Sequence, residues 1–271
     1  MMRLKSQLLL VKIINNSFIV LGVEIKVPIS ISGIWYPVIE KENLIKSGSI
    51  GLTLTLEPYI TAEIRNGSGI EFNGIEIQLP NYEILKKKLG EYKLSVYSEV
   101  PLGYGYGLSG AISLAYALGV KELTPISEED AVNTAHLSDV LSGNGLGDVI
   151  AQYYGGGLVY RKKAGGLGYG EVEVINMDWS YYPIFSQPIS QLPTKSIIKR
   201  SEIALKLIDD FLKNPSPLKF IEVAQQFTSS LGFSSEYPYS YRKKGIIVKI
   251  FEPEYGVWIK HKIASRGAYV I

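Results

Sequence analysis

Alternating glycines followed by small residues form the segment of this sequence best suited to chemistry. Gly103, Gly105 and Gly107 stand at every second position, and small side chains recur from Ser109 to Ala117. Glycine lets the backbone approach a ligand closely, and a helix N-terminus presents unpaired N–H groups and a positive dipole end to an anion. The segment therefore predicts a phosphate-binding loop and a nucleotide ligand, with a tight strand–turn–helix packing corner as the alternative.

Two common phosphate motifs do not fit this loop. A Walker A loop needs Lys and then Ser or Thr after its last glycine, but Leu108 follows Gly107. A dinucleotide fingerprint has the spacing G-x-G-x-x-G and follows an N-terminal strand. Here the glycines run G-x-G-x-G, and about 100 residues precede them. The loop therefore indicates a different class of nucleotide-binding protein.

Two acidic residues downstream of the loop could complete a phosphoryl-transfer site. Such a site needs a metal held by oxygen ligands and a group that orients or deprotonates the acceptor hydroxyl. Asp139 falls on a helix predicted over 128–141, and Asp148 follows the Gly-rich turn 143–147. The pair favours a kinase. The alternatives are that Asp148 only caps the next helix and that Asp139 is a solvated helix acid.

The pattern Pro-x-Gly-x-Gly-x-Gly-x-Ser-Gly-Ala, which begins at Pro101, resembles the phosphate loop of the GHMP kinases. The resemblance implies ATP and Mg²⁺ as cofactors and Asp148 as the catalytic residue that acts on the acceptor hydroxyl. It implies a metal shared by Ser109 and Asp139, although most relatives have Glu at the second position. The residues it implies at the ATP phosphates are Pro101, Gly103, Gly105, Gly107, Leu108, Ser109, Gly110 and Ala111.

Further motifs are similar to those of the archaeal pantoate kinases within this family. They are Ser30-Ile-Ser-Gly33, Gly48-Ser-Ile-Gly51, Ala135-His136, Gly145-Leu-Gly-Asp-Val149 and Thr194-Lys195. The likeness implies transfer of the γ-phosphate of ATP to the 4-hydroxyl of pantoate, a small hydroxy acid, in coenzyme A biosynthesis. The substrate-binding residues it implies are Ser30, Ser32, Ser49, His136, Thr194 and Lys195. His136 could instead be structural and Lys195 a surface cation. The partner of the substrate carboxylate stays open among Lys195, Lys26 and Arg65.

Two features depart from the GHMP pattern. Ser30 stands where relatives such as mevalonate kinase have Lys, so this segment offers a hydrogen bond without positive charge. The third Gly-rich motif is missing, because residues 229–241 hold one Gly and four aromatic residues. A kinase for another small alcohol (homoserine, mevalonate or a sugar) and a non-catalytic nucleotide-binding paralogue are the two alternatives. The joint presence of Ser109, Asp139 and Asp148 argues against the second.

Strands and helices in a mixed order must position these residues. Strand patterns occupy 8–14, 18–27, 51–64 and 94–100, and helices are predicted over 108–118, 128–141 and 148–154. Paired strands follow at 158–160 and 171–175, then helices at 196–213 and 218–231 and strands at 245–251, 257–262 and 268–271. This order indicates an α+β protein with an N-terminal domain over 1–175 and a C-terminal domain over 176–271. The resemblance implies the two-domain GHMP kinase fold, ribosomal protein S5 domain 2-like and then ferredoxin-like, with the site in the cleft between them.

Composition excludes several other classes of protein. The 28 basic and 26 acidic residues leave no basic surplus for nucleic acid. The chain has no cysteine and two histidines, which excludes thiolate chemistry and argues against a zinc site. No apolar run approaches the length of a membrane helix. We therefore expect a cytoplasmic enzyme without a nucleic-acid or membrane partner, and the family resemblance implies a homodimer.

Overall fold

The computed structural model describes residues 11–14, 17–20, 22–191, 201–253 and 255–271. Thr194 and Lys195, two predicted substrate-binding residues, lie outside them. The helices are α1 (Pro80–Leu89), α2 (Leu108–Leu123), α3 (Glu128–Ser142), α4 (Asp148–Tyr154), α5 (Ile203–Lys213) and α6 (Pro217–Ser230), with a 3-10 turn at Leu44–Lys46. The strands are β1 (Val11–Ile14), β2 (Ser17–Val20), β3 (Val23–Val38), β4 (Gly48–Asn66), β5 (Ile70–Phe72), β6 (Ile75–Ile77), β7 (Tyr92–Tyr97), β8 (Leu158–Lys163), β9 (Glu171–Ile175), β10 (Ile184–Pro188), β11 (Ser240–Lys243), β12 (Ile246–Ile250), β13 (Ile259–Ile263) and β14 (Tyr269–Val270).

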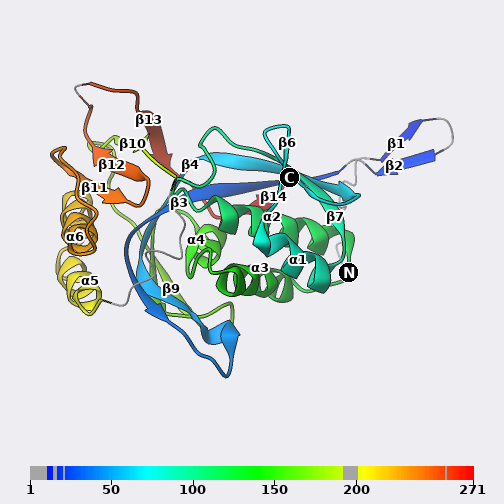
Figure 1. Ribbon diagram of the computed structural model, residues 1–271, viewed down its shortest axis with the longest axis horizontal. Coiled ribbons are helices and arrows are strands. Elements are labelled where there is room, and N and C mark those ends of the chain that lie inside the picture. Colours follow the sequence, from blue (N-terminus) through cyan, green and yellow to red (C-terminus); the bar gives the residue numbers. More distant parts are fainter. Residues whose placement is uncertain (1–10, 15–16, 21, 192–200, 254) are drawn as a thin grey trace, which may run out of the picture.

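A long hairpin of β3 and β4 runs through the body of the molecule (Figure 1). The two strands pair antiparallel from Val23 opposite Ile64 to Val38 opposite Gly48. Strand β3 continues well beyond the end predicted at residue 27. Nearly all of its residues from 27 to 37 are buried, so the alternation of apolar and polar residues that marks a half-exposed strand is absent there.

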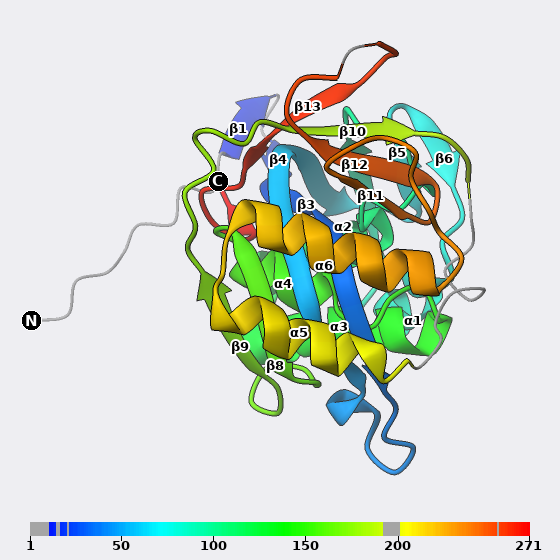
Figure 2. The same ribbon diagram turned by 90° about the vertical axis from the view of Figure 1, so that its left-hand side faces the viewer.

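Helices cover both faces of this hairpin (Figure 2). Helices α2 and α4 pack against β3 on one side, and α5 and α6 pack on the other. Close approach depends on small residues. A Cβ at Gly119 would lie 2.5 Å from Ile64, and one at Gly33 would lie 2.6 Å from the Phe220 ring. These glycines therefore set the distance between each helix layer and the sheet.

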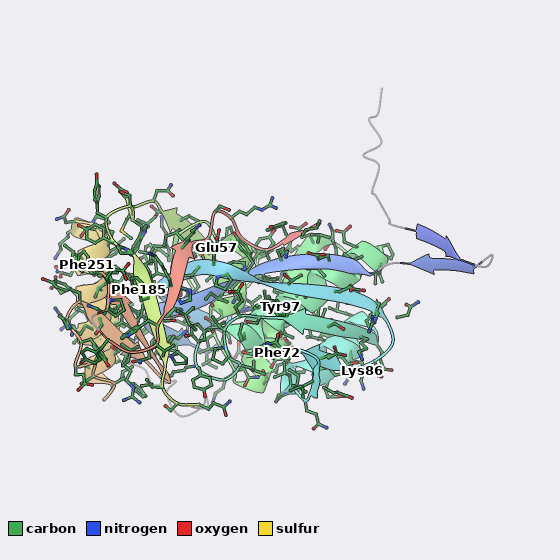
Figure 3. The ribbon with its side chains drawn as sticks, turned by 90° about the horizontal axis from the view of Figure 1, so that it is seen from above. Glu57, Phe72, Lys86, Tyr97, Phe185 and Phe251 are labelled. Atoms are coloured by element: carbon green, nitrogen blue, oxygen red, sulfur yellow. The ribbon has the colours of Figure 1, made fainter. Side chains whose placement is uncertain are left out.

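Among the described residues, 12 strands form one continuous sheet. Its main path runs β11-β12-β10-β13-β4-β7-β5-β6, and β3, β8, β9 and β14 join it through other pairs. The C-terminal strands return to the N-terminal hairpin. Strand β13 pairs with β4, with Lys262 opposite Glu57, which is labelled in Figure 3. Strand β14 pairs with β3. The predicted domain boundary at 175–176 falls between β9 and β10 and stays a prediction.

Helix boundaries near the candidate site agree with the sequence patterns. Ser127 caps α3 by accepting the N–H of Asp130, and α3 ends at Gly143, whose φ is +68°. Helix α4 begins at Asp148, as predicted, and α2 extends five residues beyond the predicted end at Leu118. The sequence patterns did not predict β10, a strand of five residues that includes the polar Ser186 and Gln187.

Candidate active site

The predicted phosphate loop leads from β7 into the N-terminus of α2. Its three glycines have positive φ angles, +90° at Gly103, +121° at Gly105 and +70° at Gly107. Gly107 is the residue before α2, and a Cβ there would collide with the hydroxyl of Ser30. Backbone conformations of this kind are accessible to glycine and strained for other residues. The loop therefore needs these glycines for its shape.

A cavity of about 600 Å³ lies against this loop. Its lining includes the apolar residues Leu79, Pro80 and Leu102 and the polar residues Ser109, Asn144 and Asp148. The other lining residues are Gly103, Gly105, Tyr106, Gly107, Leu108, Gln191, Lys243 and Lys244. The cavity thus combines residues from both sequence halves, and its size and mixed lining suit a small-molecule ligand.

Asp148 is held at the first position of α4. Its Oδ1 accepts a hydrogen bond of 2.9 Å from the hydroxyl of Ser30 on β3. Burial alone would raise its pKa, but the positive charges of Lys243 and Lys244, the bond from Ser30 and the charge of Arg161 outweigh burial and lower the pKa. Asp148 is therefore ionised at neutral pH. The predicted substrate residue Ser30 is thus in direct contact with the predicted catalytic residue.

Asp139 is buried on α3 beside Asp148. Its Oδ1 accepts a hydrogen bond of 2.9 Å from the amide of Asn81. Burial and then the charge of Asp148 raise its pKa to about 7. Among the described residues its Oδ2 has no hydrogen-bond partner, although it is buried. A Cβ at Gly145 would lie 2.6 Å from this Oδ2 and 3.2 Å from Oδ2 of Asp148, so both oxygens border the same small space.

These oxygens fit a hard divalent cation. A buried carboxylate oxygen without a partner is costly to ionise unless a cation meets it, and Mg²⁺ prefers one or two carboxylates together with phosphate and water oxygens. Ser109 lies near Asp139 and favours the ionised form of its carboxyl, so it could share the cation. The described part of the chain holds no cluster of three His, Cys, Asp or Glu side chains. A cation here would therefore complete its coordination with nucleotide phosphates and water.

The other predicted substrate residues lie around a buried arginine. Arg161 on β8 donates to Thr53 Oγ1 at 2.6 Å, to the Ser49 carbonyl at 3.1 Å and to Ser49 Oγ at 3.2 Å. Ser32 is hydrogen-bonded to Thr53 at 2.9 Å. This network places Ser32 and Ser49 next to one cation. Their predicted contact with substrate stays a prediction.

His136 and two candidate cations lie away from the cavity lining. Nε2 of His136 must donate to the carbonyl of Ser47, at 2.8 Å, because a carbonyl only accepts. Burial lowers the pKa of His136, so the ring is neutral. Lys26 contacts Thr61 and Glu24, and Arg65 is exposed near the end of β4. The hydrogen bond to Ser47 and the neutral ring favour the structural interpretation of His136.

The sequence patterns did not single out the basic residues whose charges lower the pKa of Asp148. Arg161 ends an apolar run at Leu158–Tyr160, and Lys243 and Lys244 precede a glycine at the start of a predicted strand. Two signals could have identified them: an arginine at the end of an apolar strand pattern, and a pair of lysines before a turn. Asn81, which donates to Asp139, gave no signal because it lies in a helix of no obvious chemical pattern.

A buried hydrogen-bond chain ties the phosphate loop to the C-terminal strands. The Tyr106 hydroxyl is 2.8 Å from Ser186 Oγ, which is 2.7 Å from Nε2 of His261. Nδ1 of His261 is 2.8 Å from the Glu57 carbonyl and must be the donor there. Burial lowers the pKa of His261 to about 4, so its Nε2 carries no proton and accepts from Ser186. Tyr106 therefore donates to Ser186, and each bond has a defined direction.

Comparison with known proteins agrees with this geometry. Residues 79–156, which include the loop and both acids, match the GHMP kinases N terminal domain. The pantoate kinase of Methanocaldococcus jannaschii is 32% identical over 216 residues, 74% of this chain and 78% of that protein. The chain belongs to the pantoate kinase family of GHMP kinases. The pantoate kinase of Thermococcus kodakarensis is 30% identical over 234 residues, 76% of this chain and 75% of that protein.

Family membership confirms the predicted fold class and the class of activity. A solved structure described as a phosphotransferase related to the CoA biosynthesis pathway superposes with a TM-score of 0.77. It shares 24% sequence identity, and the match covers 92% of this chain and 98% of the other. The α+β GHMP kinase fold is therefore confirmed. This member of the family is an ATP-dependent small-molecule kinase.

Proposed function

We propose that this protein transfers the γ-phosphoryl group of ATP to the 4-hydroxyl of pantoate, giving 4-phosphopantoate for coenzyme A biosynthesis. One observation carries the proposal: Asp148, ionised and fixed by Ser30 at 2.9 Å, lines the same cavity as the phosphate loop. The two relatives named above, both pantoate kinases, support the choice of acceptor.

The chemistry requires little beyond positioning and charge. The 4-hydroxyl oxygen of the acceptor forms a bond to the γ-phosphorus, the bond from that phosphorus to the bridging oxygen breaks, and ADP leaves with the electron pair. Asp148 accepts the hydroxyl proton. Since its pKa is lowered, Asp148 is a weak base and acts chiefly by orienting the hydroxyl until the proton becomes acidic during transfer.

Family membership does not by itself establish Mg²⁺, and we propose this ion from the residues of the site. Ser109 and Asp139 would hold it, with Asp148 beside them, and the unpartnered Oδ2 of Asp139 supports this choice. When bound, the ion would neutralise charge on the nucleotide phosphates. Asn81 fixes the other oxygen of Asp139, so the carboxylate is oriented before any ligand arrives.

A coupled ADP-release assay tests the proposal against its alternatives. Pantoate, homoserine, mevalonate and galactose are supplied in turn with ATP and Mg²⁺. We expect ADP release well above the acceptor-free rate with pantoate and not with the other three. Release with another acceptor alone identifies a kinase for a different small alcohol. ATP binding without release for any acceptor identifies the non-catalytic paralogue.

We also propose where the protein is located, its oligomeric state and the absence of a nucleic-acid partner. We propose a cytoplasmic homodimer that binds no nucleic acid, on the basis of the near-balanced charge and the family resemblance. Within the described ranges, no helix combines the length and the apolar character needed to cross a membrane. Size-exclusion chromatography with light scattering would measure the oligomeric state.

A further inference from the structure

The turn between β11 and β12 packs directly on the phosphate loop. Nζ of Lys243 donates to the carbonyl of Gly105 at 3.0 Å. A Cβ at Gly105 would lie 3.4 Å from the carbonyl oxygen of Lys243. On its other side, the carbonyl of Gly245 accepts from the backbone of Ile189 at 2.7 Å and of Ser190 at 3.2 Å. The turn is therefore fixed between the loop and the segment after β10.

Lys244 occupies a strained position in this turn. Lys243 pairs with Ile246, so Lys244 and Gly245 form a two-residue connection. Lys244 has a φ of +55°, a region where glycine or asparagine is the usual choice. Strained backbone of this kind tends to occur where a side chain is needed for function. The position therefore favours a role for the lysine side chain itself.

The lysine side chain belongs to the cavity. Lys244 lines it together with the glycines of the phosphate loop, Ser109 and Asp148. The residue is only 9% exposed, and its charge interacts with those of Asp139 and Asp148. The two neighbouring cations have different tasks: Lys243 contacts the Gly105 carbonyl, and Arg161 contacts Ser49 and Thr53. Ser30 adds a hydroxyl to this site and no charge.

We propose that Lys244 is a catalytic residue that contacts the γ-phosphoryl oxygens of ATP, and that Lys243 is a positioning residue that holds the phosphate loop through Gly105. During transfer Lys244 keeps its proton and stabilises negative charge on the oxygens of the moving phosphoryl group. Its role in the reaction rests on the proposed kinase function, but its contact with a triphosphate does not depend on the acceptor. The C-terminal half of the chain thereby supplies the positive charge that Ser30 cannot.

Nucleotide binding tests the proposal without any acceptor. Isothermal titration calorimetry measures ATP and ADP binding, each with Mg²⁺, to the wild type and to Lys244→Gly, Lys244→Asn and Lys244→Arg. Gly and Asn both tolerate positive φ, so at least one uncharged variant keeps the turn. Lys249→Met is the matched control, because Lys249 is a buried lysine on β12 that contacts Pro238 and does not line the cavity.

We expect the uncharged variants to bind ATP roughly 10- to 100-fold more weakly, which corresponds to one lost charge-assisted hydrogen bond. Their ADP affinity should change less than about threefold, because ADP lacks the γ-phosphoryl group. Lys244→Arg should retain most of the discrimination between ATP and ADP. The control should bind both nucleotides like the wild type.

Two results would overturn the proposal. If the uncharged variants bind ATP and ADP with the same affinities as the wild type, Lys244 has a role in the turn only. An unchanged ratio of ATP to ADP affinity with a raised KM for pantoate would assign Lys244 to the acceptor carboxylate. If Lys244 discriminates ATP from ADP but the wild type does not phosphorylate pantoate, the proposed function fails and the role of Lys244 stands.

Discussion

Asp139 and Asp148 direct one carboxylate oxygen each toward the same space beside Gly145, yet their pKa values shift in opposite directions. Burial and the neighbouring carboxylate raise the pKa of Asp139 to about 7. Lys243, Lys244, Ser30 and Arg161 overcome burial at Asp148 and lower its pKa. Titratable neighbours whose pKa values are separated in this way commonly have different tasks. Here the difference suits a metal ligand beside a group that stays ionised.

Replacement of Asp148 by Asn should separate a catalytic role from a purely structural one. We expect kcat to fall by roughly 10²- to 10⁴-fold, the usual effect of losing a positioned acid–base group. Nucleotide affinity should stay near normal. Gly147 and not Asp148 is the N-cap of α4, and Asn removes the charge that offsets the buried Lys243, Lys244 and Arg161, so the melting temperature should fall moderately while the variant stays folded. Steady-state kinetics, ATP titration and thermal unfolding of the same preparation measure all three. Turnover within a few-fold of the wild type would remove Asp148 from the mechanism.

Replacement of Asp139 by Asn should weaken the apparent affinity for Mg²⁺ more than any other change at the site. Since the metal binds the ionised carboxylate and the pKa is about 7, Mg²⁺ affinity of the wild type should rise as pH increases through 7. The variant should lose this dependence. Titrations of activity and of ATP binding with Mg²⁺ at pH 6, 7 and 8 measure it. A kinase unaffected by EDTA, or an unchanged titration in the variant, contradicts the assignment.

In the absence of metal, Asp139→Asn should also change how the stability of the protein depends on pH. The folded protein holds the proton of Asp139 up to about pH 7, whereas an unfolded chain releases it near the ordinary aspartate pKa of 3.8. The unfolded state therefore binds fewer protons between these values, and the contribution of Asp139 to the free energy of unfolding falls as pH rises. Asp139→Asn should melt several degrees above the wild type at pH 8, because each kcal/mol of added stability raises the melting temperature of a domain of this size by about 2–4 °C. The difference should disappear near pH 4, and thermal unfolding in EDTA measures it.

Gly107→Ala should damage nucleotide use and the position of Asp148 together. Its Cβ would displace the hydroxyl of Ser30, which holds Asp148. We expect kcat/KM for ATP to fall by roughly 10²-fold, because small displacements of catalytic groups have effects of that size. Gly74→Ala is the matched control: Gly74 has a φ of +82°, and its Cβ would meet no atom within 4 Å. Equal effects of the two variants would mean that backbone strain alone explains the loss.

Two tyrosines that are both buried should respond oppositely to the loss of their hydroxyl groups. Tyr106 donates to Ser186, so Tyr106→Phe should lower the free energy of unfolding by about 1 kcal/mol and raise the KM for ATP a few-fold. The Tyr241 hydroxyl is buried and has no partner among the described residues, so Tyr241→Phe should be neutral or stabilising. Thermal unfolding of both variants measures the difference. A similar loss of stability in both would contradict the assigned hydrogen-bond chain.

Local sequence determined the parts of this protein that depend on backbone chemistry. The loop around Gly105 requires positive φ, Ser127 caps α3, Gly143 ends it and α4 begins at Asp148. Each of these features depends on residues within a few positions of one another, so patterns of residue type were sufficient to predict them. The family resemblance rested on the same local motifs.

The tertiary structure decided which distant side chains complete the site. Ser30 and Asp148, 118 positions apart, come into contact because α4 packs against β3. Lys243 and Gly105, 138 positions apart, meet because the β11–β12 turn packs on the phosphate loop. Strand β3 was also longer than predicted, because burial on both faces removes the alternating pattern. Contacts across such separations depend on packing between elements, and no local pattern of residues encodes them.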